Sequence, residues 1–462
     1  MSLRFGTDGV RGLANAELTP ELTLALGRAA ARVFGAGTAV GIRPRMLIGR
    51  DTRQSGPLLA AALTAGLCAE GFDVVDLGVL PTPGVAYASV LANCPAAMIS
   101  ASHNPFRDNG IKFFSAGGRK LPDDVEEHIE TELDRLLAVS ADAAGHESDV
   151  KVGAAVGSMI NDPTDYEGLY RENLLGALEG RRLDGLKVVL DCAHGATSRV
   201  APAAFRALGA EVVVLADQPD GLNINDHCGS THPESLQAAV VANGAHAGFA
   251  FDGDADRMLA VDHTGTLVDG DQLMGMTALD LRSRGQLHED TLVVTVMSNL
   301  GLKIAMRKAG INLVETAVGD RYVLEALNAG NFSLGGEQSG HIILTDRAST
   351  GDGTLAALVV ADLIMRSGET LADHGAVMTR LPQVLKNVKG VDRARLETAT
   401  GLWDAVKAAE AELGETGRVL LRPSGTEPLV RVMVEAPTAE IANGVCDRLC
   451  DVVKTELAFS QA

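Results

Sequence analysis

The sequence is poor in aromatic residues, in paired cysteines and in positive charge. Only 3% of its 462 residues are aromatic, and its six cysteines form no C-x-x-C pair. We therefore expect reduced, packed thiols rather than a cysteine metal site or a redox site. Lys and Arg total 40 against 60 for Asp and Glu, and the net charge of −20 disfavours nucleic acid and anionic membranes as partners.

Long hydrophobic runs are also missing. No stretch reaches the length of a membrane-spanning helix, and residues 1–6 lack the basic and apolar segments of a secretion signal. The sequence thus predicts a cytoplasmic protein. Its length, its 46% hydrophobic residues and its 51 glycines are typical of an α/β enzyme with about three or four domains.

A pattern of helix, glycine and strand occurs three times, in residues 65–75, 204–214 and 304–314. Each copy is followed, after one further strand, by a loop rich in chemical groups. This pattern predicts three related α/β domains that each contribute one loop to a shared cleft. Continuous apolar runs at 187–191, 247–251 and 291–296 favour mixed, mainly parallel sheets that are covered on both faces.

The expected domains are residues 1–150, 151–258, 259–370 and 379–462. Residues 138–153 have the composition of a surface connection, and residues 368–378 that of a linker. The last domain is predicted to be a smaller α+β unit, with strands at 418–421 and 430–434 and a helix from Thr438.

The first chemical loop is residues 99–105 (ISASHNP). Ser102 follows an apolar run at 96–99, and Asn104-Pro105 forces the backbone out of regular structure. Because ligands collect at the carboxyl ends of strands in open α/β sheets, this hydroxyl is well placed to meet a substrate. The alternative is that Ser and Asn simply suit a turn.

The second loop is residues 252–257 (DGDADR), directly after a predicted strand. Asp252, Asp254 and Asp256 project from one side of an extended segment, where three carboxylates favour a hard cation such as Mg²⁺. Arg257 beside them is a candidate phosphate ligand. The EF-hand spacing is absent, and the competing interpretation is a solvated acidic turn.

Two further loops complete the set. In residues 336–341 (GEQSGH), Glu337 and Ser339 suit sugar hydroxyls and His341 suits proton transfer, although a Gly-rich turn that binds nothing is the alternative.

In residues 422–428 (RPSGTEP), followed by Arg431, two guanidiniums, two hydroxyls and loop amides indicate a phosphate site. The competing view there is a polar hairpin turn.

Together these four motifs resemble the α-D-phosphohexomutase superfamily, with one motif per domain. Residues 5–12 (FGTDGVRG) and 108–114 (DNGIKFF) are similar to its bacterial phosphoglucosamine mutase branch. The resemblance spans nearly the whole chain. It implies three related α/β domains and a smaller C-terminal α+β domain around a central cleft.

The resemblance also implies roles for the loop residues. Ser102 would carry a phosphoryl group, and Mg²⁺ would be bound by Asp252, Asp254, Asp256 and a phosphate oxygen on Ser102. Glu337 and Ser339 would hold sugar hydroxyls. The phosphate that does not react would be held by Arg422, Ser424, Gly425, Thr426 and Arg431.

The implied reaction converts glucosamine 6-phosphate to glucosamine 1-phosphate through a bound 1,6-bisphosphate, which feeds UDP-N-acetylglucosamine and cell-wall synthesis. Phosphoryl transfer needs charge neutralisation, which the metal, Arg11, Lys112 and Arg257 would supply. Lys112 and His341 are candidates for proton transfer, with His103 as a third.

Three other functions stay open from the sequence. The chain could prefer glucose or mannose phosphates, it could be a magnesium-dependent phosphatase, or it could bind sugar phosphates without catalysis. A second phosphate site disfavours a phosphatase, because a hydrolase does not need to hold a second phosphate. The family resemblance further suggests a homodimer.

Overall fold

The computed structural model describes residues 4–6, 9–36, 42–141, 150–424 and 429–459. The chain divides into two compact units. The first contains residues 1–296 and 314–375, and the second contains residues 297–313 and 376–462. Within the described residues, no helix is both long enough and apolar enough to cross a membrane.

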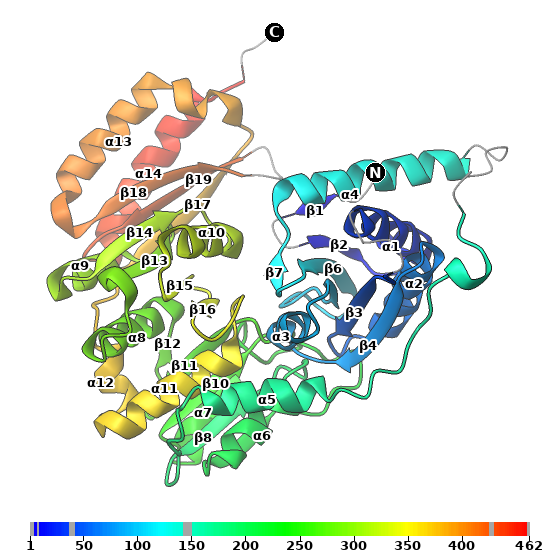
Figure 1. Ribbon diagram of the computed structural model, residues 1–462. Coiled ribbons are helices and arrows are strands. Elements are labelled where there is room, and N and C mark those ends of the chain that lie inside the picture. The colour runs from blue at the N-terminus through cyan, green and yellow to red at the C-terminus, as the bar shows by residue number, and fades with distance from the viewer. Residues whose placement is uncertain (1–3, 7–8, 37–41, 142–149, 425–428, 460–462) are drawn as a thin grey trace. The chain divides into compact units, whose positions relative to one another are not determined.

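The first domain is built on a seven-stranded sheet in the order β1-β2-β6-β5-β3-β4, with β7 paired to β6 (Figure 1). Its strands are β1 (Phe5–Gly6), β2 (Gly9–Leu13), β3 (Arg45–Arg50), β4 (Asp73–Val79), β5 (Ala96–Ile99), β6 (Asp108–Ser115) and β7 (Arg119–Lys120). Its helices are α1 (Pro20–Gly35), α2 (Gly56–Ala69), α3 (Thr82–Ala92) and α4 (Asp123–Ala141).

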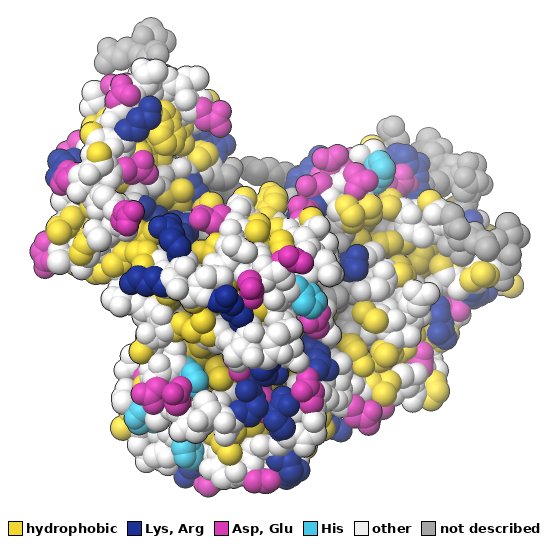
Figure 2. All heavy atoms as spheres, turned by 60° about the vertical axis from the view of Figure 1, so that its left-hand side comes forward, with side chains coloured by type: hydrophobic (Ala, Val, Ile, Leu, Met, Phe, Trp, Pro, Cys, Tyr) yellow, Lys and Arg dark blue, Asp and Glu magenta, His cyan; other side chains and the backbone are white. Residues whose placement is uncertain are grey.

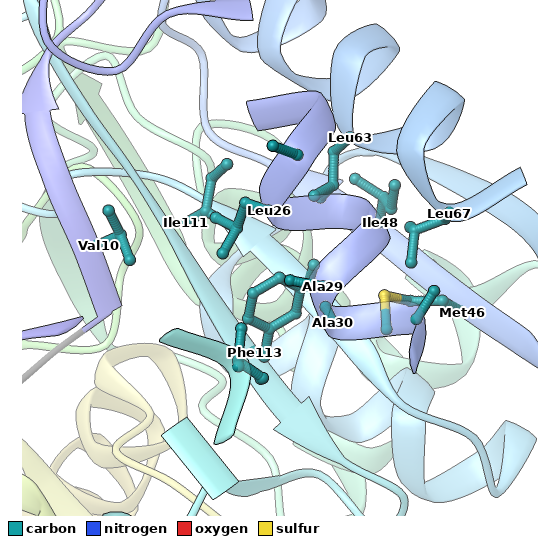
Figure 3. Packing of buried hydrophobic residues seen from close by; sticks show 14 of the residues in the cluster. Val10, Leu26, Ala29, Ala30, Met46, Ile48, Leu63, Leu67, Ile111 and Phe113 are labelled. Atoms are coloured by element: carbon teal, nitrogen blue, oxygen red, sulfur yellow. The ribbon is translucent and has the colours of Figure 1, made fainter. Parts of the chain in front are cut away.

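The core of this domain lies between one face of the sheet and helices α1, α2 and α4. Figure 3 shows Leu26 of α1 and Leu63 of α2 packed near Ile48 and Phe113 of the sheet. Burying each such side chain contributes about 2 kcal/mol. Helix α3 covers the opposite face, because Gly49, the neighbour of Ile48, faces Val85.

The next two sheets have the orders β12-β11-β10-β8-β9 and β14-β13-β15-β16. The first of them is formed by β8 (Lys187–Asp191), β9 (Glu211–Leu215), β10 (Ala247–Phe251), β11 (Met258–Asp262) and β12 (Leu267–Val268), with helices α5 (Tyr166–Gly176), α6 (Val200–Ala207) and α7 (Glu234–Ala242). The other is formed by β13 (Thr291–Thr295), β14 (Asn312–Thr316), β15 (Leu334–Gly336) and β16 (Ile342–Leu344). The short 3-10 helix η1 (Gly153–Ala155) belongs to a segment that contacts the first domain, where Arg43 donates to the backbone oxygen of Ala154.

Six helical segments lie between residues 270 and 375. They are α8 (Gly270–Ser283), η2 (His288–Asp290), α9 (Leu300–Ala309), α10 (Asp320–Gly330), α11 (Gly353–Ser367) and α12 (Leu371–Gly375). Helix α12 lies inside the predicted linker 368–378, so this connection is partly helical. Helix α4 likewise extends to Ala141, into the predicted surface connection, and residues 142–149 of that connection lie outside the described residues.

The predicted repeat is present in all three copies. Helices α2, α6 and α9 are followed by Gly71, Gly209 and Gly310, each with a positive φ, and then by β4, β9 and β14. Glycine adopts this left-handed conformation without the steric penalty of a side chain, and it therefore ends each helix.

The loops with chemical groups share one topology. Strands β5, β10 and β15 each run parallel to one neighbour and antiparallel to the next strand in the chain, which is β6, β11 or β16. Each loop therefore connects two adjacent antiparallel strands at the carboxyl end of a buried strand. The sheets are mixed, as predicted. In the first sheet, antiparallel pairs outnumber parallel ones among the described strands, because β6 runs opposite to β2, β5 and β7 and β1 runs opposite to β2.

The second unit contains a three-stranded antiparallel sheet in the order β17-β19-β18. Its elements are β17 (Gln383–Lys389), η3 (Arg393–Thr398), α13 (Thr400–Leu413), η4 (Gly414–Thr416), β18 (Arg418–Pro423), β19 (Leu429–Glu435) and α14 (Ala439–Glu456). The buried Glu435 carboxylate pairs with Arg418 and accepts hydrogen bonds from Asn299 and the backbone of Leu300. These contacts hold α9 in the same unit.

Charged side chains of both signs are mixed over the face drawn in Figure 2. Some of them form networks between helices. Arg366 of α11, for example, pairs with Asp280 of α8 and with Asp362 of its own helix. A mixed surface of this kind does not attract an anion, so a phosphate ligand needs a local group of cations.

Asp352 provides a test of the packing between α5 and α11. It caps α11 and accepts a hydrogen bond from Tyr170 at 2.9 Å. Its burial outweighs these hydrogen bonds, which favour the charged form, and raises its pKa from 3.8 to about 6. Because the native state then binds the proton more tightly than the unfolded chain, this group's contribution to stability falls as the pH rises from about 4 to 6.

We predict that Asp352→Asn removes this pH-dependent loss of stability, because asparagine does not ionise and also caps helices well. The unfolding free energy of the variant, relative to the parent, should rise between pH 4 and pH 7 by at most about 3 kcal/mol. Urea denaturation followed by circular dichroism measures it. Parallel pH profiles for the two proteins would contradict the prediction.

Candidate active site

Ser102 lies in the loop between β5 and β6, at the carboxyl end of β5. Its side chain is buried, and its hydroxyl donates a hydrogen bond to Asp252 Oδ2 at 2.6 Å. His103 Nδ1 lies 3.2 Å from the same hydroxyl. The serine loop and the aspartate loop, 150 residues apart, thus meet at one point.

The three aspartates predicted to bind metal are brought together. Asp252, Asp254 and Asp256 are all buried, and one carboxylate oxygen from each lies within 4.8 Å of the others. The predicted extended segment is a turn in the structure: residues 253–256 are turn or bend, and Ala255 has a φ of +57°. This tight turn between β10 and β11 brings the three carboxylates together.

Neighbouring side chains balance only part of the negative charge of these three carboxylates. Lys112 Nζ lies 2.9 Å from Asp254 Oδ2 and 3.6 Å from Asp256 Oδ2, and Thr82 donates to Asp254 at 2.7 Å. Among the described residues, Asp254 Oδ1 and Asp256 Oδ1 are buried without a hydrogen-bond partner. Such oxygens are costly to bury unless a further cation binds them, so the donor set fits Mg²⁺.

The pKa values in the cluster reflect the same crowding. Burial, followed by the charges of Asp256 and Asp254, raises the pKa of Asp252 well above its usual range. Burial also acts to raise the pKa of Asp256, but Lys112, His341 and Arg257 outweigh it and lower that pKa. A bound divalent cation would favour the charged form of all three carboxylates.

Three predicted cations and one histidine lie at the serine and aspartate loops. Lys112 is on β6, and Arg11 on β2 reaches the backbone oxygen of Ala101 at 3.5 Å. The backbone N–H of Arg257 donates to Asp252, and its guanidinium Nε lies 3.8 Å from Asp256. Burial, with the charges of Arg257 and Arg11, lowers the pKa of His103, which keeps this imidazole neutral near pH 7.

The predicted sugar loop connects β15 and β16. Glu337 accepts a hydrogen bond from the backbone of Gly319 at 3.0 Å, and Ser339 is exposed beside it, 3.5 Å from the Glu337 carboxylate. His341, in contrast, is fully buried, with Nδ1 3.7 Å from Asp256 and Nε2 3.6 Å from Asp320. These contacts place His341 between Asp256 of the carboxylate cluster and Asp320.

The predicted phosphate loop belongs to the second unit. Arg422 and Arg431 are direct cross-strand partners on β18 and β19, and burial, with the charge of Arg431, lowers the pKa of Arg422. Like charges in this arrangement repel each other, and an anion between them would relieve the repulsion. Ser424 is buried beside them, whereas Gly425 and Thr426 lie outside the described residues.

Four family models match consecutive parts of the chain. They describe phosphoglucomutase/phosphomannomutase α/β/α domains I, II and III, at residues 2–139, 170–265 and 269–381, and the C-terminal domain at residues 385–452. Phosphoglucosamine mutases of Thermobifida fusca and Paenarthrobacter aurescens are 54% and 57% identical to it. The alignments cover 100% of this chain and of the first relative, and 99% of this chain and 98% of the second.

The chain belongs to the phosphoglucomutase/phosphomannomutase family, in its phosphoglucosamine mutase branch. The family, the fold class and the isomerase activity predicted from the sequence are thereby confirmed.

Solved structures of this family share the fold. A phosphoglucomutase/phosphomannomutase family protein of Burkholderia thailandensis has a TM-score of 0.79 at 26% identity, with 97% of each chain covered. An N-acetylphosphoglucosamine mutase of Aspergillus fumigatus, solved with GlcNAc-6P and magnesium, has a TM-score of 0.68 at 18% identity, with 99% of this chain and 96% of that chain covered.

The sequence analysis missed several side chains that contact the phosphohexomutase motifs. Thr82 follows β4, Asp320 follows β14, and Asp51 and Arg53 follow β3. Each lies just beyond the carboxyl end of a strand, the position that drew attention to Ser102. The strand bounds of the structure are needed to apply that rule to these residues, because no strand was predicted at 45–50 and β4 and β14 end at Val79 and Thr316.

We predict that Asp254→Asn weakens Mg²⁺ binding about 100-fold or more. The variant loses a carboxylate that fits the metal. The positive charge of Lys112 is then paired with one carboxylate fewer, and it repels the metal ion more strongly. Calorimetric titration of the metal-stripped protein measures this change. Asp184→Asn, which alters an exposed aspartate of the same domain, is the matched control. Equal Mg²⁺ affinity in the two variants would contradict the assignment.

Proposed function

We propose that this chain interconverts glucosamine 6-phosphate and glucosamine 1-phosphate, with Ser102 as the phosphoryl carrier and a sugar 1,6-bisphosphate as the bound intermediate. The relatives that align over nearly its full length and carry the name phosphoglucosamine mutase support this activity. The observation that carries the role of Ser102 is its hydroxyl, 2.6 Å from Asp252 within a buried carboxylate cluster.

Burial suits Ser102 to hold a phosphoryl group without losing it to water. The residue is only 1% exposed, so attack by bulk solvent is limited while the sugar is oriented. Asp252, Asp254 and Asp256 would hold Mg²⁺ together with a phosphate oxygen on Ser102. The metal would neutralise charge that develops on the transferring group.

The reaction needs two opposite transfers. In the first, the Oγ–P bond of Ser102 breaks, a bond forms to the 1-hydroxyl oxygen of glucosamine 6-phosphate, and that hydroxyl loses its proton. After the bisphosphate turns over, its 6-phosphoryl group passes to Ser102 Oγ and the sugar oxygen regains a proton. Atoms and charge balance over the cycle without a co-reactant.

A mutase must hold the phosphate that does not react in either half of the cycle. The Arg422–Arg431 pair supports this role, because two adjacent guanidiniums on one hairpin favour a bound anion. Ser424 would assist, with Gly425 and Thr426 as further predicted ligands. Glu337 and Ser339 would bind the sugar hydroxyls, and Arg11 and Arg257 would neutralise phosphate charge.

Three groups are proposed for proton transfer. Of the three, His103 lies nearest to the oxygen that would carry the phosphoryl group, with Nδ1 3.2 Å from Ser102 Oγ. Lys112 lies between Asp254 and Asp256, two of the proposed metal ligands. His341 would act through Asp256, since it is buried behind that carboxylate. Glucosamine 1-phosphate formed here would supply UDP-N-acetylglucosamine synthesis. The cytoplasmic location and the homodimer stay predictions from the sequence.

We predict a growing glucosamine 1-phosphate signal in phosphorus NMR when the protein is incubated with Mg²⁺, glucosamine 6-phosphate and a trace of glucose 1,6-bisphosphate. Glucose and mannose 6-phosphates, tested in parallel, should turn over more slowly. Release of inorganic phosphate in place of the 1-phosphate would identify a phosphatase and overturn the proposed mutase.

We predict that Ser102→Ala reduces mutase turnover by at least about 1,000-fold while the fold persists, because the acceptor of the phosphoryl group is gone. Ser115→Ala serves as the control, because it also removes a hydroxyl from the first domain, at the last residue of β6. Circular dichroism checks folding in both variants. Normal turnover in a folded Ser102→Ala protein would disprove the carrier role.

A further inference from the structure

The backbone of Ser102 has an unusual conformation that its surroundings must maintain. Its φ is +52°, in the left-handed region that residues with a side chain rarely occupy. Such a conformation persists only where neighbouring contacts over-determine it. The hydroxyl of Ser102 depends on this backbone for its direction toward Asp252.

Arg53, just beyond β3, supplies much of this restraint. Its side chain is 0% exposed, and Nε donates to Asp51 Oδ2 at 2.8 Å. Its remaining N–H groups donate to three backbone oxygens of the serine loop, those of Ser102 at 2.9 Å, Asn104 at 2.8 Å and Pro105, and to that of Asp108, the first residue of β6, at 3.0 Å. All five donors of the guanidinium are thereby used, three of them on the serine loop.

Two further side chains complete the restraint. Ser100 Oγ accepts a hydrogen bond from the backbone N–H of Ser102 at 2.9 Å and donates to Asp51 at 2.7 Å. Asn225, from the loop that precedes α7, donates to the backbone oxygens of Ser102 at 2.9 Å and of Asn104 at 3.0 Å. Both backbone polar groups of Ser102 are therefore held by buried side chains.

We propose that Arg53 is a positioning residue for phosphoryl transfer, which acts with Ser100 and Asn225 to hold the Ser102 backbone in its left-handed conformation. The hydrogen bonds described for the Ser102 hydroxyl go to Asp252 and His103, so these three side chains act on the backbone and not on the reacting oxygen. The proposal rests on the mutase activity proposed above.

A lysine at position 53 would keep the positive charge beside Asp51 and lose the planar fork that reaches four backbone oxygens. In a transfer that depends on alignment, an error of about 1 Å can lower the rate about 100-fold. We therefore expect Arg53→Lys to lower kcat for glucosamine 6-phosphate by about 10- to 100-fold. The KM should stay within about threefold, because the predicted sugar and phosphate ligands are unchanged.

The matched control is Arg43→Lys. Arg43 also donates to one carboxylate and two backbone oxygens, those of Asp73, Ala154 and Val156, but its side chain is 40% exposed. Its replacement should leave kcat within about twofold of the parent. Intact-mass spectrometry gives a second measurement, the rate at which Ser102 is phosphorylated by glucose 1,6-bisphosphate, which should fall in parallel with kcat in Arg53→Lys.

Ser100→Ala and Asn225→Ala provide the test if Arg53→Lys does not fold, since each removes only a small side chain. Both should lower kcat by about 3- to 10-fold, again with little change in KM. Folded variants with the parent's kcat and phosphorylation rate, or with an altered KM alone, would overturn the positioning role. A parent protein without mutase turnover would instead overturn the proposed function, and the positioning role with it.

Discussion

The structure around the candidate active site depends on the repulsion among three buried carboxylates at the end of β10. Two unit charges a few ångströms apart repel strongly where water is excluded, and the described contacts of Asp252, Asp254 and Asp256 leave two of their oxygens without a hydrogen-bond partner. The loop is stable only if cations and donors from other elements converge on it. Lys112 from β6 and Thr82 from α3 do so, and they tie the first domain to the second.

The repeated topology explains why the chemical groups can converge. Each motif loop of the three α/β domains joins a buried strand to an antiparallel neighbour, so its ends are fixed by sheet hydrogen bonds while its middle is free to carry polar residues. The β18–β19 hairpin of the second unit follows the same plan. One local design thus positions all four motifs for which roles are proposed above.

Much of this arrangement could be predicted from the sequence, because the motifs and the glycine repeats are local signals. The strands that precede Ser102 and Asp252 have the predicted bounds. The partners of Ser102 could not be predicted. Arg53 and Asn225 are distant in sequence, and only tertiary packing brings them together. For the same reason, the burial of His341 between two aspartates was not foreseen.

The hydrogen-bond network behind Ser102 shows how stability and function are divided in this fold. A left-handed residue with a side chain costs about 1–2 kcal/mol, and burying Asp51 and Arg53 costs several more. An apolar pair of similar volume would pack at least as well, so stability alone does not account for a buried ion pair here. What the Arg53 guanidinium adds is a planar fork of donors, which holds three backbone oxygens of the serine loop and that of Asp108 at the start of β6 at once. In this arrangement the Ser102 hydroxyl points toward Asp252 of the carboxylate cluster.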